Sequence, residues 1–151
     1  MRSGCVYAAD DFSGNQVTPS QNESGSKEPR QVLPRILVVD DERRIADSLT
    51  EILEMAGFYV MAAYDGCEAV ETAVKFRPDY VLTDVLMPKM NGVELAIAIS
   101  KMFPATRILL FSGQTGIAEI LQDAQKRGFE FELIAKPIHP LQLIEHLKNG
   151  Q

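Results

Sequence analysis

Five short apolar segments alternate with five stretches in which apolar residues recur at helical spacing. The first apolar segment, residues 35–39, reads RILVV and is continuous, as is typical of a strand covered on both faces. The helical face that follows it ends at Gly57, a suitable C-terminal cap. That face consists of Ile45, Leu49, Ile52, Leu53 and Ala56.

The same order of strand and helix repeats to the end of the chain. We expect further strands at residues 58–64, 80–83, 107–111 and 131–135. We expect further helices around residues 69–74, 92–103, 117–124 and 140–148. Pro78, Pro104 and Gly128 follow three of these helices, and Pro140 suits the first turn of the last one.

Five consecutive strand–helix units predict an α/β fold with one parallel sheet and helices on both faces. The expected architecture is a flavodoxin-like, doubly wound, five-stranded sheet in the order 2-1-3-4-5, with five helices. In such a sheet the ligand site lies at the carboxyl ends of the strands, near the switch point between strands 1 and 3. The residues that follow the strands are therefore the candidate functional residues.

Residues 1–31 have a different composition, rich in Ser, Gln, Asn, Gly, Pro and Glu, and no lasting apolar period. We expect a disordered leader, or sequence added by a misplaced start codon, followed by a single domain over residues 32–151. The hydrophobic content of 46% is enough for one core.

Net charge and hydropathy exclude some classes of function. A net charge of -6 argues against a general nucleic-acid binder, so we expect no direct nucleic-acid contact. No apolar run is long enough to insert into a membrane. Cys5 and Cys67 are expected to be free thiols in a reducing compartment, which favours a cytoplasmic location.

Polar residues stand at the ends of four predicted strands, and the sheet topology would bring them together. They are Asp40, Asp41, Asp84, Ser112 and Lys136. Each has an ordinary explanation by itself: the aspartates and the serine as helix caps or turn residues, the lysine as a solvated side chain. It is their joint placement that indicates a site.

Three carboxylates packed together repel one another, so they either bind a proton or attract a cation. Carboxylate oxygens suit Mg²⁺, which also binds phosphate oxygens. A lysine and a hydroxyl beside them would neutralise and hydrogen-bond a phosphoryl group. In that arrangement Asp84 would be the nucleophile and would form an aspartyl phosphate.

Four segments of the chain resemble the signature segments of bacterial two-component response-regulator receiver domains. They are ILVVDDE, VLTDVLMPKMNGVEL, LLFSG and IAKPI, in the family's order. The resemblance, which is to single-domain, chemotaxis-regulator-like members, extends over residues 33–149. It implies that Asp84 accepts the phosphoryl group, and that Ser112 and Lys136 bind it. It also implies that Mg²⁺ is bound by Asp40, Asp41, Asp84 and the backbone carbonyl of Leu86.

The resemblance further implies a cis peptide bond before Pro137 and a phosphorylation-dependent signalling switch rather than a turnover enzyme. The phosphoryl donor would be a sensor histidine kinase or a phosphotransfer protein, and the output a contact with a downstream protein of unknown identity. Because the sequence stops just after the last helix, we expect either that the receiver itself makes this contact or that it relays the phosphoryl group onward. Ile45 and Ala46 are candidates for the kinase contact, and Met87 and Met90 are expected to pack.

One departure from the family pattern concerns the switch. An aromatic residue is common three positions before the lysine, but here that position is Leu133. Phe131, two residues earlier on the same face of the strand, is the alternative. Gly113 follows the hydroxyl, where alanine is common in the family, and leaves room for a phosphoryl group.

Two other functions use similar residues. A phosphatase of the haloacid dehalogenase type also has a strand-end aspartate and Mg²⁺, but it needs a second acid where this chain has Leu86. A nucleotide-binding flavodoxin-like protein would need a glycine-rich phosphate loop, and the sequence contains neither of the common forms.

Overall fold

A single five-stranded parallel sheet organises the protein. The computed structural model describes residues 33–113, 117–137 and 139–149; the leader predicted at residues 1–31 lies outside them. The strands are β1 (Arg35–Val39), β2 (Tyr59–Ala63), β3 (Tyr80–Asp84), β4 (Arg107–Ser112) and β5 (Glu132–Ala135). Their order in the sheet is β2-β1-β3-β4-β5, and every pairing is parallel, which confirms the predicted topology.

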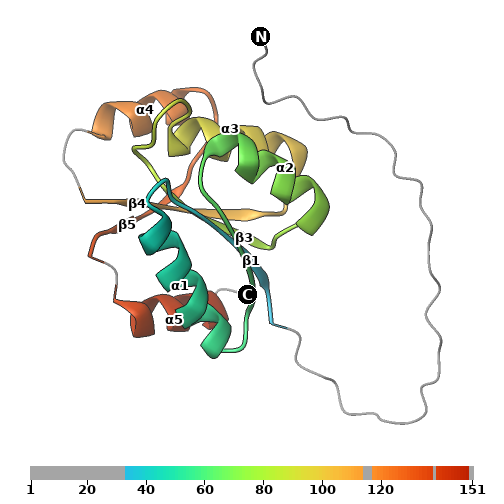
Figure 1. Ribbon diagram of the computed structural model, residues 1–151. Helices are drawn as coiled ribbons and strands as arrows, with labels where there is room; N and C mark the ends of the chain where they lie inside the picture. The colour runs from blue at the N-terminus through green and yellow to red at the C-terminus, as the bar shows by residue number, and fades with distance from the viewer. Residues whose placement is uncertain (1–32, 114–116, 138, 150–151) are drawn as a thin grey trace, which may run out of the picture.

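The helices lie in two layers, one on each face of the sheet (Figure 1). They are α1 (Arg43–Met55), α2 (Gly66–Phe76), α3 (Gly92–Met102), α4 (Ala118–Lys126) and α5 (Pro140–Asn149). Helices α1 and α5 cover one face, and α2, α3 and α4 cover the other. The connections are short, so each helix begins close to the carboxyl end of the strand before it.

The continuous apolar run of β1 follows from this double cover. Ile36 and Val38 face the layer of α1 and α5, whereas Leu37 and Val39 face the layer of α2, α3 and α4. All four side chains are buried. A strand with two buried faces needs an apolar residue at every position rather than at every second one.

The ends of the helices are set by local chemistry. Gly57 follows α1 with a φ of 103°, in the left-handed region, and the next N–H, that of Phe58, donates to the Leu53 carbonyl at 3.1 Å. At the other end of a helix, Asp65 and Asn91 are the N-caps of α2 and α3. These caps fix the loops at the edge of the sheet where the candidate residues lie.

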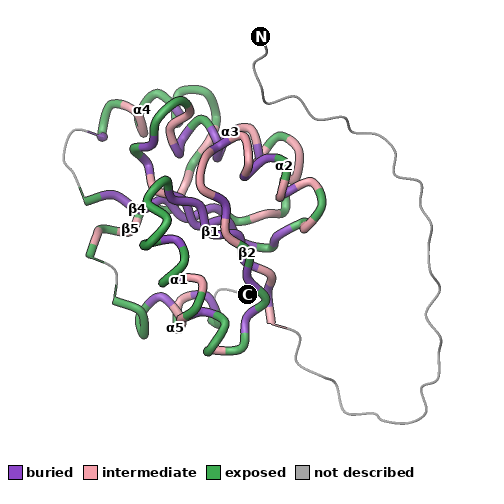
Figure 2. Tube along the Cα trace, viewed as in Figure 1, coloured by how far each residue is buried: buried purple, intermediate pink, exposed green. Residues whose placement is uncertain are grey.

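Burial is uneven across the sheet (Figure 2). The central strands are buried almost throughout, but β5, at the edge, has three exposed residues out of its four. Helix α4 is also lightly packed, since Ala124 is its one buried residue. The part of the molecule formed by α4 and β5 is therefore held by fewer apolar contacts than the rest.

The expectation of a free thiol is wrong for Cys67, which is disulfide-bonded in the structure. Cys67 is partly exposed in the first turn of α2. Cys5 lies outside the described residues. In the part of the chain that the structure describes, no helix is long and apolar enough to cross a membrane.

The packing of α5 predicts different effects for two leucines of the same helix. Leu147 is fully buried and Leu141 is 68% exposed. Leu147→Ala is expected to lower the free energy of unfolding by about 2–5 kcal/mol, because it leaves a cavity in the core. Leu141→Ala is expected to change it by less than about 0.5 kcal/mol. Urea unfolding followed by circular dichroism measures both, and equal losses would contradict the docking of α5 on the sheet.

Candidate functional site

The candidate residues converge at the carboxyl edge of the sheet. Asp40 directly follows β1, and Asp84 is the last residue of β3, one strand away. Ser112 ends β4 opposite Ala135, the last residue of β5, so Lys136 leaves the sheet beside it. The parallel register therefore places all of the strand ends on one side of the molecule, as the sequence predicts.

Three carboxylates form a compact group at this edge. One oxygen each from Asp40, Asp41 and Asp84 lies within 4.8 Å of the others. Asp40 is buried, Asp84 is partly buried and Asp41 is exposed, so the group opens to solvent on one side. A set of oxygen donors that is partly accessible to water matches the preference of Mg²⁺, which keeps several waters when it binds to proteins. The residues present thus fit this ion.

The burial and grouping of these carboxylates change the pKa of Asp40. Burial raises the pKa of the Asp40 carboxyl above its ordinary value, and the negative charges of Asp84 and Asp41 raise it further. A hydrogen bond from the Glu42 N–H and the positive charge of Lys136 oppose that rise in pKa. The group is therefore a site where added positive charge is favourable.

Lys136 supplies positive charge beside these carboxylates. Its Nζ lies 3.5 Å from Asp84 Oδ2 and 3.8 Å from Asp40 Oδ2. The Lys136 backbone N–H donates to the Ser112 carbonyl at 3.0 Å, which ties the lysine to β4. The peptide bond between Lys136 and Pro137 is cis, as the family resemblance implied. Lys136 is thus an ion-pair partner, not a solvated lysine.

Gly113 gives the lysine its path across the end of β4. A Cβ built at Gly113 would lie 3.3 Å from Lys136 Cβ and 3.7 Å from Lys136 Cδ. The first distance is tighter than an ordinary contact, so a larger residue at this position would press on the lysine side chain. The glycine therefore lets Lys136 pass close to the backbone.

The ordinary explanation of Asp40 as a helix cap is partly correct. Its Oδ1 accepts a hydrogen bond from the Glu42 N–H at 3.0 Å, just before α1. The N-cap residue itself is Glu42, which makes no side-chain cap hydrogen bond. Because the other oxygen of Asp40 faces Lys136, the same carboxylate both holds the start of the helix and belongs to the site.

Ser112 and Leu86 complete the predicted set. Ser112 is 8% exposed, at the end of β4. Leu86 lies in the loop between β3 and α3, and its side chain is exposed. The roles of the Ser112 hydroxyl and the Leu86 carbonyl stay predictions.

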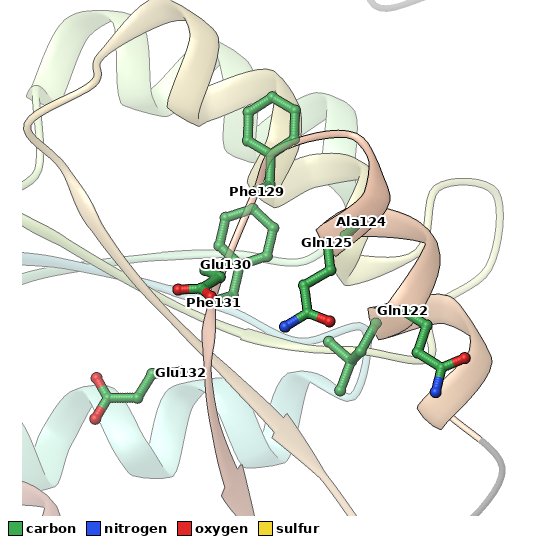
Figure 3. A pocket seen from close by; sticks show the side chains of 8 residues that line it. Gln122, Ala124, Gln125, Phe129, Glu130, Phe131 and Glu132 are labelled. Carbon is green, nitrogen blue, oxygen red and sulfur yellow. The ribbon is translucent and has the colours of Figure 1, made fainter.

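The choice between Leu133 and Phe131 as the switch residue can be judged from the strand. Phe131 stacks on Phe129, with ring centroids 6.1 Å apart, and the two line a hollow of about 500 Å³ between α4 and β5 (Figure 3). Ser112 pairs with Ala135, so Phe131 lies about 13 Å back along the chain at 3.3 Å per residue. Phe131 is too far from Ser112 to contact it, whereas the nearer residue Leu133 is 43% exposed.

The two residues expected to contact a kinase have different environments. Ile45 is 43% exposed on α1 and is available to a partner. The expectation for Ala46 is wrong, because its side chain is fully buried in the core under α1. Ala46 shares a helical face with Leu49 and Leu53, at spacings of the kind that mark a buried stripe.

The structure adds two glycines whose role the sequence analysis did not recognise. A Cβ at Gly92 would overlap the carbonyl oxygen of Asp84, so only glycine allows α3 to begin so close to β3. A Cβ at Gly66 would lie 2.6 Å from the Met90 sulfur. The pattern Asn-Gly at residues 91–92 is a visible signal for the first, but nothing in the sequence pairs Gly66 with Met90.

Comparison with known proteins gives one consistent family. The family described as response regulator receiver domain matches residues 36–148. The chain is 35% identical to the chemotaxis protein CheY of Thermotoga maritima over 114 residues, covering 75% of this chain and 93% of that protein. It is 30% identical to the transcriptional regulatory protein PrrA of Mycobacterium tuberculosis over 115 residues, covering 76% of this chain. The chain spans about half of that regulator's length, 48%.

Solved structures agree with this assignment. The chemotaxis protein CheY4 of Vibrio cholerae has a TM-score of 0.69 at 31% identity, covering 78% of this chain and 98% of that one. A response regulator receiver domain protein from Clostridium thermocellum also has a TM-score of 0.69, at 30% identity, covering 78% of this chain and 93% of that one. The flavodoxin-like sheet is thus shared with both.

The ion pairs of Lys136 predict a stability effect in the absence of metal. In Lys136→Ala, Asp40 and Asp84 lose the cation that both face, so the free energy of unfolding is expected to fall by about 1–2 kcal/mol. Lys126→Ala, at an exposed position of α4, is the control and is expected to change it by less than about 0.5 kcal/mol. Urea unfolding with a chelator at low salt measures both. Equal changes in the free energy of unfolding of the two variants would contradict the role of Lys136 in balancing the carboxylate charges.

Proposed function

Because this chain belongs to the response regulator receiver domain family of two-component signalling, we propose that it is a phosphorylation-dependent switch that accepts a phosphoryl group on Asp84. Receiver domains are signalling modules, so the expected output is a change of protein contacts rather than a released product. The observation that carries the proposal is the placement of Lys136 Nζ 3.5 Å from Asp84 within the three-carboxylate group.

Asp84 is the acceptor in this proposal because its carboxylate is accessible and faces a cation. Its side chain is 17% exposed, whereas that of Asp40 is 6% exposed and partly committed to the Glu42 N–H. A carboxylate oxygen of Asp84 attacks phosphorus and forms a new P–O bond. The bond from phosphorus to the donor breaks, and the leaving group keeps that electron pair. Water later hydrolyses the acyl phosphate and restores the carboxylate.

Lys136 and Ser112 act on the oxygens of the phosphoryl group. The ammonium group of Lys136 exchanges its pairing with Asp84 for a pairing with a phosphoryl oxygen, since the reaction adds negative charge at that point. The Ser112 hydroxyl donates a hydrogen bond to another phosphoryl oxygen. Both residues sit on strand ends that the sheet holds in place, so the crevice is preorganised for the added charge.

The same carboxylates are the proposed ligands of Mg²⁺. Asp40, Asp41, Asp84 and the Leu86 carbonyl would hold it, and when bound it supplies charge neutralisation to the phosphoryl oxygens. Burial, and then the negative charges of Asp84 and Asp41, raise the pKa of Asp40, so positive charge beside these carboxylates would be favourable. The close grouping of three carboxylates supports the choice of a dication as cofactor.

Two surfaces are proposed for the partners. The donor, a sensor histidine kinase or phosphotransfer protein, would approach the open side of the site near α1, where Ile45 is exposed. The downstream protein would contact the surface formed by α4, β5 and α5. Exposed Leu133 and Leu141 on this surface, and the light packing of α4, support a region whose contacts change with phosphorylation. A cytoplasmic location fits such partners.

The test is incubation with acetyl phosphate and Mg²⁺, followed by intact mass spectrometry. We expect a mass increase of one phosphoryl group in the wild type and in Asp123→Ala, which removes an exposed aspartate of α4. We expect no increase in Asp84→Ala, because the acceptor oxygen is gone. Failure of the wild type to form an adduct with this donor and with a cognate kinase would falsify the proposal.

A phosphatase of the haloacid dehalogenase type gives a different result in the same assay. Such an enzyme releases phosphate from monoesters with repeated turnover, and it needs an acid at the position of Leu86. We expect no turnover of p-nitrophenyl phosphate by this protein. Sustained release of phosphate that depends on Asp84 would favour the phosphatase instead.

A further inference from the structure

The loop between β3 and α3, residues 85–91, rests on the first residue of α2. Gly66 is buried there, and a Cβ built on it would lie 2.6 Å from Met90 Sδ, 2.9 Å from Met90 Cβ and 3.1 Å from Met90 Cγ. Two of these distances are shorter than real Cβ contacts. Gly66 does not have a left-handed φ, so glycine is required here by space rather than by backbone conformation.

The type of atom in contact decides what a larger residue would do. The Met90 sulfur is at the end of a flexible side chain and could turn away. Met90 Cβ is attached directly to the backbone, so a displacement of this atom displaces the loop itself. The contact therefore depends on the position of the loop backbone as well as on the rotamer of Met90.

The loop has little freedom to absorb such a displacement locally. The Met90 N–H donates to the Pro88 carbonyl at 2.7 Å, and the Gly92 N–H donates to the Val85 carbonyl at 2.7 Å. Lys89 is already in the left-handed region, with a φ of 69°. The first bond ties Met90 to the middle of the loop and the second joins its two ends, so a shift at Met90 is passed to the segment that carries Leu86.

The start of α2 is held by hydrogen bonds of its own. Asp65 Oδ1 accepts a hydrogen bond from the Glu68 N–H at 2.8 Å, and Glu68 Oε1 accepts one from the Tyr64 N–H at 2.9 Å. The Tyr64 hydroxyl donates to Asp47 Oδ1 of α1 at 2.6 Å. Because the backbone on both sides of Gly66 is held, we expect the loop to move when a residue with a Cβ replaces Gly66.

We propose that Gly66 and Met90 are positioning residues for the candidate site: their contact sets the place of the loop at residues 85–91, and so of Asp84 and the Leu86 carbonyl. The inference rests on the proposed function, because it assigns these residues a role in metal and phosphoryl binding. Neither residue touches the reacting group. Their effect passes through the backbone of the loop.

The test is a double-mutant cycle on the full chain. Gly66→Ala is expected to weaken Mg²⁺ binding by roughly tenfold or more, as loss of a supporting contact does at metal sites. In a Met90→Gly background, which lacks the opposing Cβ, Gly66→Ala is expected to cause little further weakening. Titration of Mg²⁺ followed by amide chemical shifts measures the affinity, and the shifts of residues 85–91 without metal report the loop directly.

Leu147→Ala is the control for loss of stability alone. It removes a buried contact in α5, away from the site, and is expected to lower stability while leaving Mg²⁺ affinity unchanged. If Gly66→Ala binds Mg²⁺ as the wild type does, or costs as much in the Met90→Gly background as alone, the positioning role is wrong. If Gly66→Ala does not fold, folding of the double variant supports the contact and its failure to fold overturns it.

The proposed function is judged separately, from the wild type. A wild-type chain that forms the phosphoryl adduct while the cycle shows no coupling removes only the positioning role of Gly66 and Met90. A wild-type chain that neither binds Mg²⁺ nor forms the adduct removes the proposed function, and the positioning role with it.

Discussion

The repulsion among Asp40, Asp41 and Asp84 is the constraint on which the site depends. Gathering three acids does not stabilise the fold, because burial and then the negative charges of Asp84 and Asp41 raise the cost of ionising Asp40. The parallel sheet imposes the grouping by ending β1 and β3 side by side. Lys136, which directly follows β5, offsets part of the repulsion. The negative charge that remains is the reason for which a dication is proposed as the cofactor.

Holding these charged groups close together also places tight steric limits on the backbone around the site. Gly92 allows α3 to start against the Asp84 carbonyl, Gly66 allows the loop to lie on α2, and Gly113 allows Lys136 to cross β4. At Gly92 and Gly113 the missing Cβ leaves space for the backbone of Asp84 and the side chain of Lys136, and at Gly66 it leaves space for Met90 of the loop. The glycines at these positions allow the charged groups of the site to stay at fixed distances from one another.

Much of this was predictable from sequence because each strong local signal agrees with the fold. Residues 35–39 were placed correctly since a continuous apolar run has few alternatives, and Gly57 ends α1 with the expected positive φ. The site residues followed from topology, as each stands at a strand end. What escaped prediction depends on contacts distant in sequence. The meeting of Gly66 with Met90 is set by how α2 packs against the loop, which no local pattern records, whereas the burial of Ala46 is visible in its spacing to Leu49 and Leu53.

The least predictable part is also the least packed. A receiver that couples its hydroxyl to an aromatic ring needs that ring near the end of β5. Here Phe131 stacks on Phe129 beside α4 instead. The position where the ring is expected is occupied by Leu133. An aliphatic side chain has no hydroxyl or ring face to offer to Ser112, so any coupling through Leu133 acts by packing alone. Because β5 is an edge strand and Ala124 is the one buried residue of α4, small shifts there cost little. The proposed response therefore rests on rearrangement of a loosely held surface, not on a single rotating side chain.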